Sequence, residues 1–178
     1  MKFDSYVFLS KVFLFKNLSE ESLREILSKT NTQIKKYSRK EEIYSPSSYE
    51  SNLCFIINGE CSVERIKCDG GSLPLNTLRP CQSFGIMTIL SPDGEFPTRV
   101  IAKKETEILL ISKDDTLRLI NSYPAVAMNV IRFLSQKISF LNEKVATFSS
   151  PTVEEKLSNY ILSEYKKSGK REICFMWQ

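Results

Sequence analysis

Apolar residues change their spacing twice along this chain, and the changes divide it into three zones. Up to about residue 30 the spacing is that of a helix, with Leu23, Ile26 and Leu27 on one stripe. Ser19 precedes two glutamates, a pattern that is typical of a helix N-cap with acidic residues in the first turn. We therefore expect an N-terminal helix that begins after Ser19.

Between about residues 34 and 112 the pattern changes to short strands separated by turn residues. The run L-C-F-I-I at 53–57 is almost continuously apolar, whereas Cys61 and Val63 alternate with polar residues. Asn58-Gly59 lies between these segments and favours a tight hairpin, because both residues tolerate a positive φ. Further strands are expected at 100–102 and 107–112. Short strands at this spacing predict a sandwich, jelly roll or barrel rather than alternating strands and helices.

The third zone is helical again, and its apolar residues follow a heptad repeat. Steps of four and three residues alternate along Ala127, Ile131, Leu134, Ile138, Leu141, Val145 and Phe148. The flanking positions are polar, so the stripe is narrower than that of a helix that packs on its own domain. We therefore predict that two copies of the chain associate through this helix. The residues expected in the dimer interface are Ala127, Ile131, Leu134, Ile138, Leu141 and Val145.

A break and a further helix are expected after this zone. Ser149-Ser150-Pro151 interrupts the long helix, and Thr152 to Glu155 form a capping-box pattern that starts another. Ser168-Gly169-Lys170 ends that helix. The last residues, E-I-C-F-M-W-Q, begin an apolar, strand-like segment, as expected of a chain that is one part of a longer protein.

The absence of histidine excludes several kinds of chemistry. It removes a Ser-His-Asp triad, a His general base, a proximal haem ligand and His-ligated zinc or iron. The first four of the five cysteines are separated by 7, 7 and 13 residues, which fits no zinc or iron–sulfur ligand run. We therefore expect no metal and no cofactor, and a cupin-like metalloenzyme is a weak alternative.

Charge and hydropathy favour an intracellular chain. The net charge of +4 is spread along the sequence and does not by itself indicate nucleic acid. Asp4 and Lys11 interrupt the apolar N-terminus, and no run approaches the roughly 18 apolar residues of a membrane span. An odd number of cysteines without a signal peptide is typical of reduced thiols, so we expect a cytoplasmic protein without a membrane partner.

Several segments, taken in order, carry a resemblance to a known family. They are F-I-I-N-G-E-C-S-V at 55–63, F-G-I-M-T-I-L at 84–90, V-I-A-K-K-E-T-E-I-L-L-I-S at 100–112 and N-E-K-V at 142–145, followed by the break before T-V-E-E-K-L at 152–157. In this order and spacing the chain resembles the Crp/Fnr family of bacterial transcription regulators. The resemblance covers essentially the whole chain.

The resemblance implies a domain organisation and a regulatory, non-enzymatic role. It implies a cyclic-nucleotide-binding-like sensor domain at 1–120, mainly β with helices and folded as a double-stranded β-helix, or jelly-roll barrel. It also implies a dimerisation helix at 121–149 that forms a parallel homodimer. Residues 151–178 would be the first part of a winged helix-turn-helix domain that binds DNA. Because the rest of that domain is not in the chain, we do not expect these residues alone to bind DNA specifically.

The segment 84–102 is where the resemblance bears on the ligand. In cyclic-nucleotide-binding members, a glutamate follows the glycine equivalent to Gly85 and binds the ribose, and an arginine before the next strand pairs with the cyclic phosphate. Ile86 and Phe96 stand at these positions here, although Gly85 and the turn Pro92-Asp93-Gly94 are kept. An unpaired buried phosphate is very costly, so these residues argue against a cyclic nucleotide.

We therefore expect a pocket that takes an apolar or non-nucleotide effector, or a packed core that needs no small molecule. The residues expected in the pocket are Phe84, Gly85, Ile86, Met87, Phe96, Thr98, Arg99, Leu141 and Asn142. Two alternatives stay open. Arg99 could replace the missing arginine of a cyclic-nucleotide site, although an odd shift along a strand places it on the opposite face. A cysteine such as Cys61 or Cys68 could serve as a redox sensor.

Overall fold

The computed structural model describes residues 5–46, 50–67, 70–91, 98–149 and 152–168. The chain divides into two units, Met1–Val130 and Ile131–Gln178, and each is described by itself. The long helix α5 (Pro124–Ser149) begins in the first unit and continues in the second.

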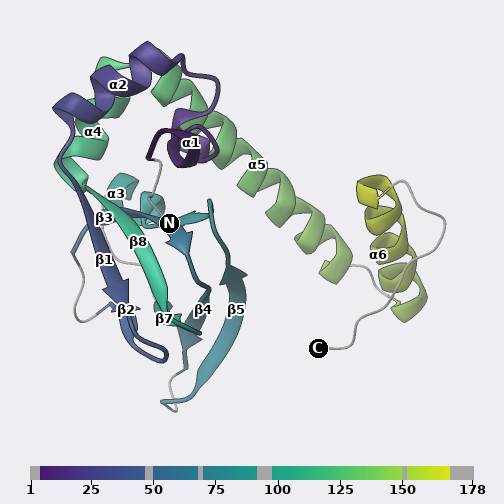
Figure 1. Cartoon of the computed structure of the whole chain (residues 1–178). Helices are drawn as coiled ribbons and strands as arrows, with labels where there is room; N and C mark the ends of the chain where they lie inside the picture. Colours follow the sequence, from purple (N-terminus) through teal and green to yellow (C-terminus); the bar gives the residue numbers. More distant parts are fainter. Residues whose placement is uncertain (1–4, 47–49, 68–69, 92–97, 150–151, 169–178) are drawn as a thin grey trace. The chain divides into compact units, whose positions relative to one another are not determined.

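Within the described residues, two four-stranded antiparallel sheets form the centre of the first unit (Figure 1). One sheet has the strand order β1 (Thr32–Tyr37), β8 (Thr106–Ser112), β3 (Asn52–Asn58) and β6 (Ser83–Phe84). The other has the order β2 (Glu42–Tyr44), β7 (Thr98–Ala102), β4 (Cys61–Ile66) and β5 (Ser72–Leu78). The expected mainly β fold with flanking helices is confirmed as a sandwich of two sheets.

Strand β3 is buried on both of its faces. All side chains from Leu53 to Ile56 are buried, and alternate residues of a strand face opposite sides of the sheet. Cys54 and Ile56 therefore join the core between the two sheets. Phe55 faces the other way, where its ring centroid lies 6.0 Å from that of Phe13. Burial on both faces is the physical reason for the continuous apolar run at 53–57.

Short helices complete the first unit, and Figure 1 shows α1, α2 and α4 at one end of the sandwich. They are α1 (Ser5–Leu9), the 3-10 helix η1 (Phe13–Phe15), α2 (Glu20–Lys29), α3 (Ile86–Leu90) and α4 (Lys113–Ser122). The Ser19 hydroxyl accepts a hydrogen bond from the Ser22 backbone N–H at 3.2 Å, which confirms the predicted N-cap of α2.

The start of α5 is tied to the N-terminal segment by a buried asparagine. The Nδ2 atom of Asn129 donates to the backbone oxygens of Leu14, at 3.1 Å, and Lys16, at 2.8 Å. These bonds satisfy two carbonyl groups of the segment around η1. They therefore fix the first turns of α5 within the first unit.

The predicted hairpin at Asn58-Gly59 is wrong. β3 and β4 do not pair with each other, because β3 lies between β8 and β6 while β4 lies between β7 and β5. A tight hairpin of this kind needs a positive φ at both turn residues, but Asn58 keeps a negative φ and Gly59 alone is positive, at 100°. A Cβ atom on Gly59 would lie 2.6 Å from the Cα atom of Thr106. Gly59 thus allows the chain to pass close to β8 where it crosses from one sheet to the other.

In the second unit, α5 continues and α6 (Val153–Ser168) follows it. The hydroxyl of Thr152 accepts from the Glu155 backbone N–H at 3.2 Å, which confirms the predicted N-cap, and the helix ends at Ser168 as expected. Residues 172–178, expected to begin a strand, lie outside the described residues. No helix in the described ranges has the length and apolar character needed to cross a bilayer.

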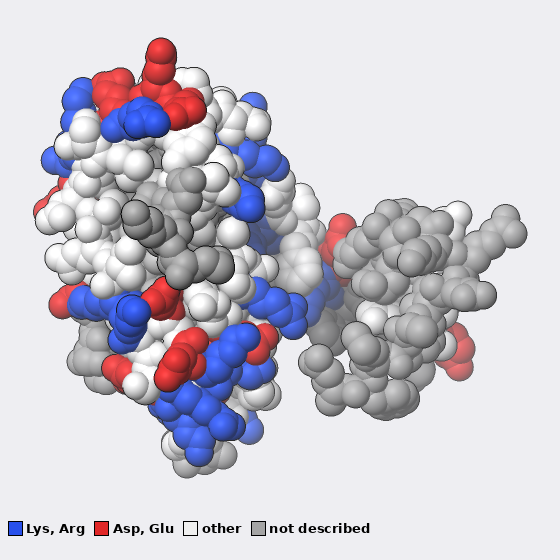
Figure 2. Space-filling view, viewed as in Figure 1, with Lys and Arg blue, Asp and Glu red and all other residues white. Residues whose placement is uncertain are grey.

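Charged side chains are mixed on the face shown in Figure 2. Lys and Arg gather at the lower end of the first unit in this view, and Asp and Glu stand among them. Ion pairs of the sandwich include Lys36 with Glu107, at 2.7 Å, and Lys103 with Glu60, at 3.9 Å. The Lys and Arg side chains visible on this face are therefore mixed with carboxylates rather than gathered in one broad basic surface.

Candidate functional site

Gly85 is the turning point of the segment in which the pocket was predicted. It follows β6, adopts a left-handed conformation (φ 95°, ψ −19°) and caps α3. A Cβ atom at this position would collide with the backbone carbonyl oxygen of Asn52, so the close approach of α3 to β3 requires glycine. The hydroxyl of Thr88 donates to the Gly85 carbonyl at 2.7 Å.

The residues on either side of Gly85 have different surroundings. Phe84 is half-buried and lines a cavity that is described below. Ile86 is only 3% exposed and belongs to the core, whereas Met87 is 49% exposed. Ile86 is therefore a packing residue at the position where cyclic-nucleotide-binding members carry a carboxylate.

Thr98 and Arg99 face opposite sides of β7. Thr98 is buried, and it shares its side of the strand with Val100 of the core between the sheets. Arg99 points the other way, where its Nε and Nη2 atoms donate to one carboxylate oxygen of Glu64, at 3.1 and 3.0 Å. The structure thus brings Arg99 to Glu64 on β4 and not to Phe84 or Ile86.

The environment of Glu64 favours its ionised form. Burial raises the pKa of its carboxyl, but hydrogen bonds from Ser72, Arg99 and Ser62 together outweigh that effect and hold the pKa below its ordinary value. Glu64 is therefore a carboxylate at neutral pH and a full partner for Arg99.

None of the remaining residues predicted for the pocket belongs to the described part of the first unit. Phe96 and the turn Pro92-Asp93-Gly94 lie outside the described residues. Leu141 and Asn142 belong to the second unit, where both are exposed. Their place in a pocket stays a prediction.

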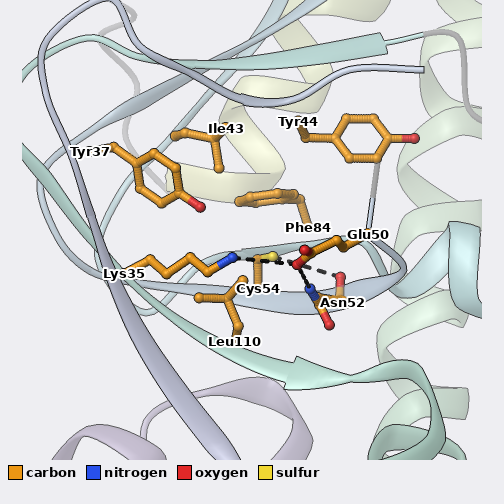
Figure 3. Close-up of a pocket in the computed structure, with 9 residues that line it drawn as sticks. All are labelled: Lys35, Tyr37, Ile43, Tyr44, Glu50, Asn52, Cys54, Phe84 and Leu110. Carbon is orange, nitrogen blue, oxygen red and sulfur yellow. Dashed lines mark hydrogen bonds and ion pairs between the residues drawn. The ribbon is translucent and has the colours of Figure 1, made fainter. Parts of the chain in front are cut away.

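A cavity of about 150 Å³ lies within the sandwich of the first unit (Figure 3). Its apolar and aromatic lining comes from both sheets, and three polar side chains complete it. The lining consists of Tyr37, Ile43, Tyr44, Cys54, Phe84 and Leu110 together with Lys35, Glu50 and Asn52. Among the expected pocket residues that the structure describes, Phe84 alone is part of this lining.

The polar side chains of the cavity interact with each other. The Nζ atom of Lys35 lies 3.4 Å from Oε2 of Glu50, and Nδ2 of Asn52 donates to the same oxygen at 3.1 Å. The side chains of Lys35 and Glu50 are 43% and 74% exposed, so the charged groups lie at the mouth of the cavity. The backbone oxygen of Asn52 also accepts a hydrogen bond from the Cys54 thiol, at 3.7 Å.

The inner lining favours neutral groups. Burial raises the pKa of the Tyr37 hydroxyl to about 12 and that of the Cys54 thiol to about 12. Both groups are therefore uncharged at neutral pH. The cavity combines an apolar, uncharged interior with one positive and one negative charge at its mouth.

The thiols of the sandwich core do not have the properties of a redox sensor. Cys54 and Cys61 are both buried, and burial raises the pKa of the Cys61 thiol to about 11. Sensor cysteines need an accessible thiolate, so these two thiols are packing groups. Cys81 is half-buried, and Cys68 and Cys174 lie outside the described residues. Within the described ranges no group of three potential metal ligands occurs.

The sequence did not single out the polar lining, and the reason is physical. Lys35 and Tyr37 stand at alternate positions of β1 and therefore share the face that looks into the sandwich. A lysine on a strand is normally a solvent-facing residue, so its pattern alone gives no reason to place it in a cavity. Glu50 reaches the same place from the segment before β3.

The exposed residues of the second unit form the apolar stripe predicted from the heptad repeat. Ile131, Ile138, Leu141 and Val145 on α5 are 56%, 59%, 57% and 61% exposed. Leu134 is half-buried, as is Ala127 in the first unit, and the side chain of Phe148 is not described. Lys137 and Lys144 lie over the rings of Phe133 and Phe140 beside the stripe, at 5.3 and 5.1 Å from the ring centroids.

A comparison with protein families decides what kind of domain this is. Residues 34–123, half of the chain, match the family model described as the cyclic nucleotide-binding domain. The chain belongs to this family. The matched residues begin within β1 and run past the end of α4, and they include all the described residues that line the cavity.

Two relatives from Thermus thermophilus share sequence and structure with this domain. The cyclic AMP receptor protein of Thermus thermophilus is 27% identical over 125 residues, which are 70% of this chain and 56% of that protein. The crystal structure of the Thermus thermophilus catabolite activator protein superposes with a TM-score of 0.66 and 26% identity, covering 77% of this chain and 63% of that one. The chain therefore spans less than two thirds of the length of either relative.

A third structure shares the fold at lower identity. The sensor domain of the transcriptional regulator DNR from Pseudomonas aeruginosa superposes with a TM-score of 0.66 and 15% identity, covering 84% of this chain and 95% of that domain. The resemblance to the Crp/Fnr family is thus confirmed, and the domain is a non-enzymatic regulatory module of that type.

Proposed function

We propose that this chain is the effector-sensing and dimerisation part of a Crp/Fnr-type DNA-binding transcription regulator, and that its effector is not a cyclic nucleotide. Residues 1–120 are the sensor domain, with the sheets closed as a jelly roll, and 121–149 are the dimerisation helix. Residues 151–178 begin a winged helix-turn-helix, and DNA is bound by residues that follow them. The protein acts in the cytoplasm.

The observation that carries the choice of effector is the pairing of Arg99 with Glu64. A cyclic phosphate needs a guanidinium partner, and Arg99 already donates two hydrogen bonds to a carboxylate on the outer side of β7. Turning it into the sandwich would leave Glu64, whose side chain is only 17% exposed, without its cation. The burial of Ile86 supports the same conclusion, because it leaves the ribose without a carboxylate acceptor.

Dimerisation through α5 is supported by the exposed apolar stripe. Four large apolar side chains that are each more than half exposed on one helix favour association, since they gain about 25 cal/mol for each Å² removed from water. Their spacing is that of a two-stranded coiled coil. An effector that binds the DNA-competent dimer more tightly than the other dimer geometry would then shift the population toward the DNA-competent dimer.

Two measurements on this chain test the proposal. Titration calorimetry with cyclic AMP and cyclic GMP is expected to give no heat of binding, whereas saturable binding of either would establish the alternative in which the family's usual ligand is kept.

Sedimentation is expected to show a dimer at micromolar concentration. Ile138→Glu, which places a charge in the stripe, is expected to give a monomer. Gln136→Glu, on the polar side of the same helix, is the matched control and should remain dimeric. A monomeric parent chain would remove the dimerisation part of the proposal.

A further inference from the structure

The cavity between the sheets has a size and a charge pattern that together define a class of ligand. Its volume of about 150 Å³ is below the roughly 300 Å³ at which pockets for drug-sized molecules begin. The occupant is therefore a small molecule. Its buried part must be apolar, because it meets aromatic rings, aliphatic side chains and a protonated thiol.

The mouth of the cavity bears one charge of each sign. Lys35 and Glu50 are the charged residues among the described lining, and their ionised groups are 3.4 Å apart. An ion pair this exposed stabilises a protein by only about 0–1 kcal/mol, so a ligand can separate the two groups at little cost. Figure 3 shows the Lys35 side chain extending across the cavity toward Glu50, with the ring of Phe84 beside it.

A ligand with a single charge fits this mouth poorly. A carboxylate bound to Lys35 would stand beside the carboxylate of Glu50, and an ammonium group bound to Glu50 would stand beside Lys35. A ligand that carries both groups on neighbouring atoms satisfies both residues. It also keeps the net charge of the occupied site at zero.

The surroundings give the two ends of such a ligand an orientation. A second hollow of about 120 Å³ adjoins the cavity through Glu50, Asn52 and Leu110, and Asp115 is its other charged residue. Arg118 and the Asn31 backbone N–H already bind Asp115, so this hollow is acidic but partly compensated. An ammonium group is therefore favoured on the side of Glu50, and a carboxylate on the side of Lys35.

We propose that this cavity binds a free α-amino acid with an apolar side chain. The side chain enters between Phe84 and Leu110, the carboxylate pairs with Lys35 and the ammonium group pairs with Glu50. Of the described residues next to Gly85, Phe84 lines this cavity, whereas Ile86 and Met87 do not. Binding at this site requires neither a dimer nor DNA, so the inference stands apart from the proposed function.

Titration calorimetry of this chain with L-leucine and its two deletion analogues tests the ligand class. L-Leucine is expected to bind. 4-Methylpentanoate lacks the ammonium group and 3-methylbutylamine lacks the carboxylate, so each is expected to bind at least about tenfold more weakly. Glycine, which lacks the side chain, is expected to give no heat at the same concentration. Equal affinity for 4-methylpentanoate and L-leucine, or no heat from L-leucine at millimolar concentration, would overturn the proposal.

Substitutions at the mouth test the assigned residues. Lys35→Gln and Glu50→Gln are each expected to weaken L-leucine binding by about tenfold. Lys36→Gln is the matched control, because Lys36 lies on the other face of β1 and pairs with Glu107. The double variant Lys35→Glu with Glu50→Lys is expected to restore L-leucine binding, with the ammonium group and the carboxylate of the ligand in exchanged positions. An equal loss from Lys35→Gln and Lys36→Gln would refute the site, and circular dichroism verifies that each variant is folded.

The result is separable from that of the proposed function. A chain that sediments as a dimer and ignores L-leucine refutes the ligand assignment alone. A monomeric chain that binds L-leucine refutes the dimer alone.

Discussion

Arg99 and Glu64 stand directly opposite each other on the antiparallel strands β7 and β4, and their side chains meet on the outer side of the sheet. The pair places the arginine that follows the glycine segment on the side of the strand away from the core, while Thr98 beside it is buried. A one-residue step along a strand reverses the direction of a side chain, so a small change of position decides which face receives the guanidinium.

We expect the variant Glu64→Gln to lower the free energy of unfolding by about 1 kcal/mol at pH 7, since Arg99 loses an ionised partner. The folded-state pKa of Glu64 is lowered, so its contribution is present above the ordinary carboxyl pKa and is lost as the pH falls through the folded pKa. The difference between the parent chain and the variant should therefore shrink below about pH 4.

Urea unfolding between pH 3 and pH 7 measures this dependence. Glu20→Gln is the control, because Glu20 pairs with Arg24 on the exposed surface of α2 and should change the unfolding free energy by less than about 0.5 kcal/mol. A difference for Glu64→Gln that did not vary with pH would contradict the assignment of the pKa to this pair.

The buried thiols are expected to be unreactive in the folded protein. In a variant with Cys68, Cys81 and Cys174 replaced by serine, Cys54 and Cys61 should react with a disulfide reagent at pH 8 only as fast as the protein unfolds. Their pKa values of about 12 and about 11 leave almost no thiolate at this pH. The parent chain, which keeps the half-buried Cys81, serves as the comparison. Rapid modification of both remaining thiols would reopen the redox alternative.

The same thiols predict a loss of stability in alkali. A thiol whose folded-state pKa is raised stabilises the fold fully below its unfolded pKa of about 8.5, and this contribution declines as the pH rises toward the folded value. The free energy of unfolding of the two-cysteine variant should therefore fall between about pH 8.5 and 11. Replacing Cys61 by alanine should make that part of the pH profile less steep, and the remaining decline would come from Cys54.

A comparison of Gly85 with Gly70 separates the cost of backbone strain from the cost of a steric collision. Both have a positive φ, but a Cβ atom at Gly70 meets nothing within 4 Å, whereas one at Gly85 meets the backbone of Asn52. Gly70→Ala should cost about 1–2 kcal/mol from the left-handed backbone alone. Gly85→Ala should cost more than about 3 kcal/mol, because α3 or β3 must also move. If both variants lost the same free energy of unfolding in urea, α3 would move away from β3 without measurable cost.

The outline of the fold followed from local rules. The N-caps at Ser19 and Thr152 were predictable because a hydroxyl before a run of helix formers satisfies a nearby backbone N–H, and both hydrogen bonds are present. The continuous apolar run at 53–57 was likewise informative, since a strand covered on both faces has no polar side. The order of these signals was sufficient to indicate the family.

The pairing of strands was less predictable. Asn58-Gly59 has the composition of a hairpin, yet it joins two sheets, because each flanking strand pairs with partners that are distant in the sequence. Non-local pairing depends on which surfaces the folded sheets bury, and a dipeptide contains no information about that.

The sequence by itself determined the family, the three zones of the chain and the loss of the carboxylate that follows Gly85, because these depend on residue types and short spacings. Tertiary structure alone decided that Arg99 pairs with Glu64 and that Lys35 and Glu50 meet at the mouth of a cavity. Lys35 and Glu50 are fifteen residues apart on different segments, and only the packing of two sheets brings an ammonium group and a carboxylate together above an apolar interior.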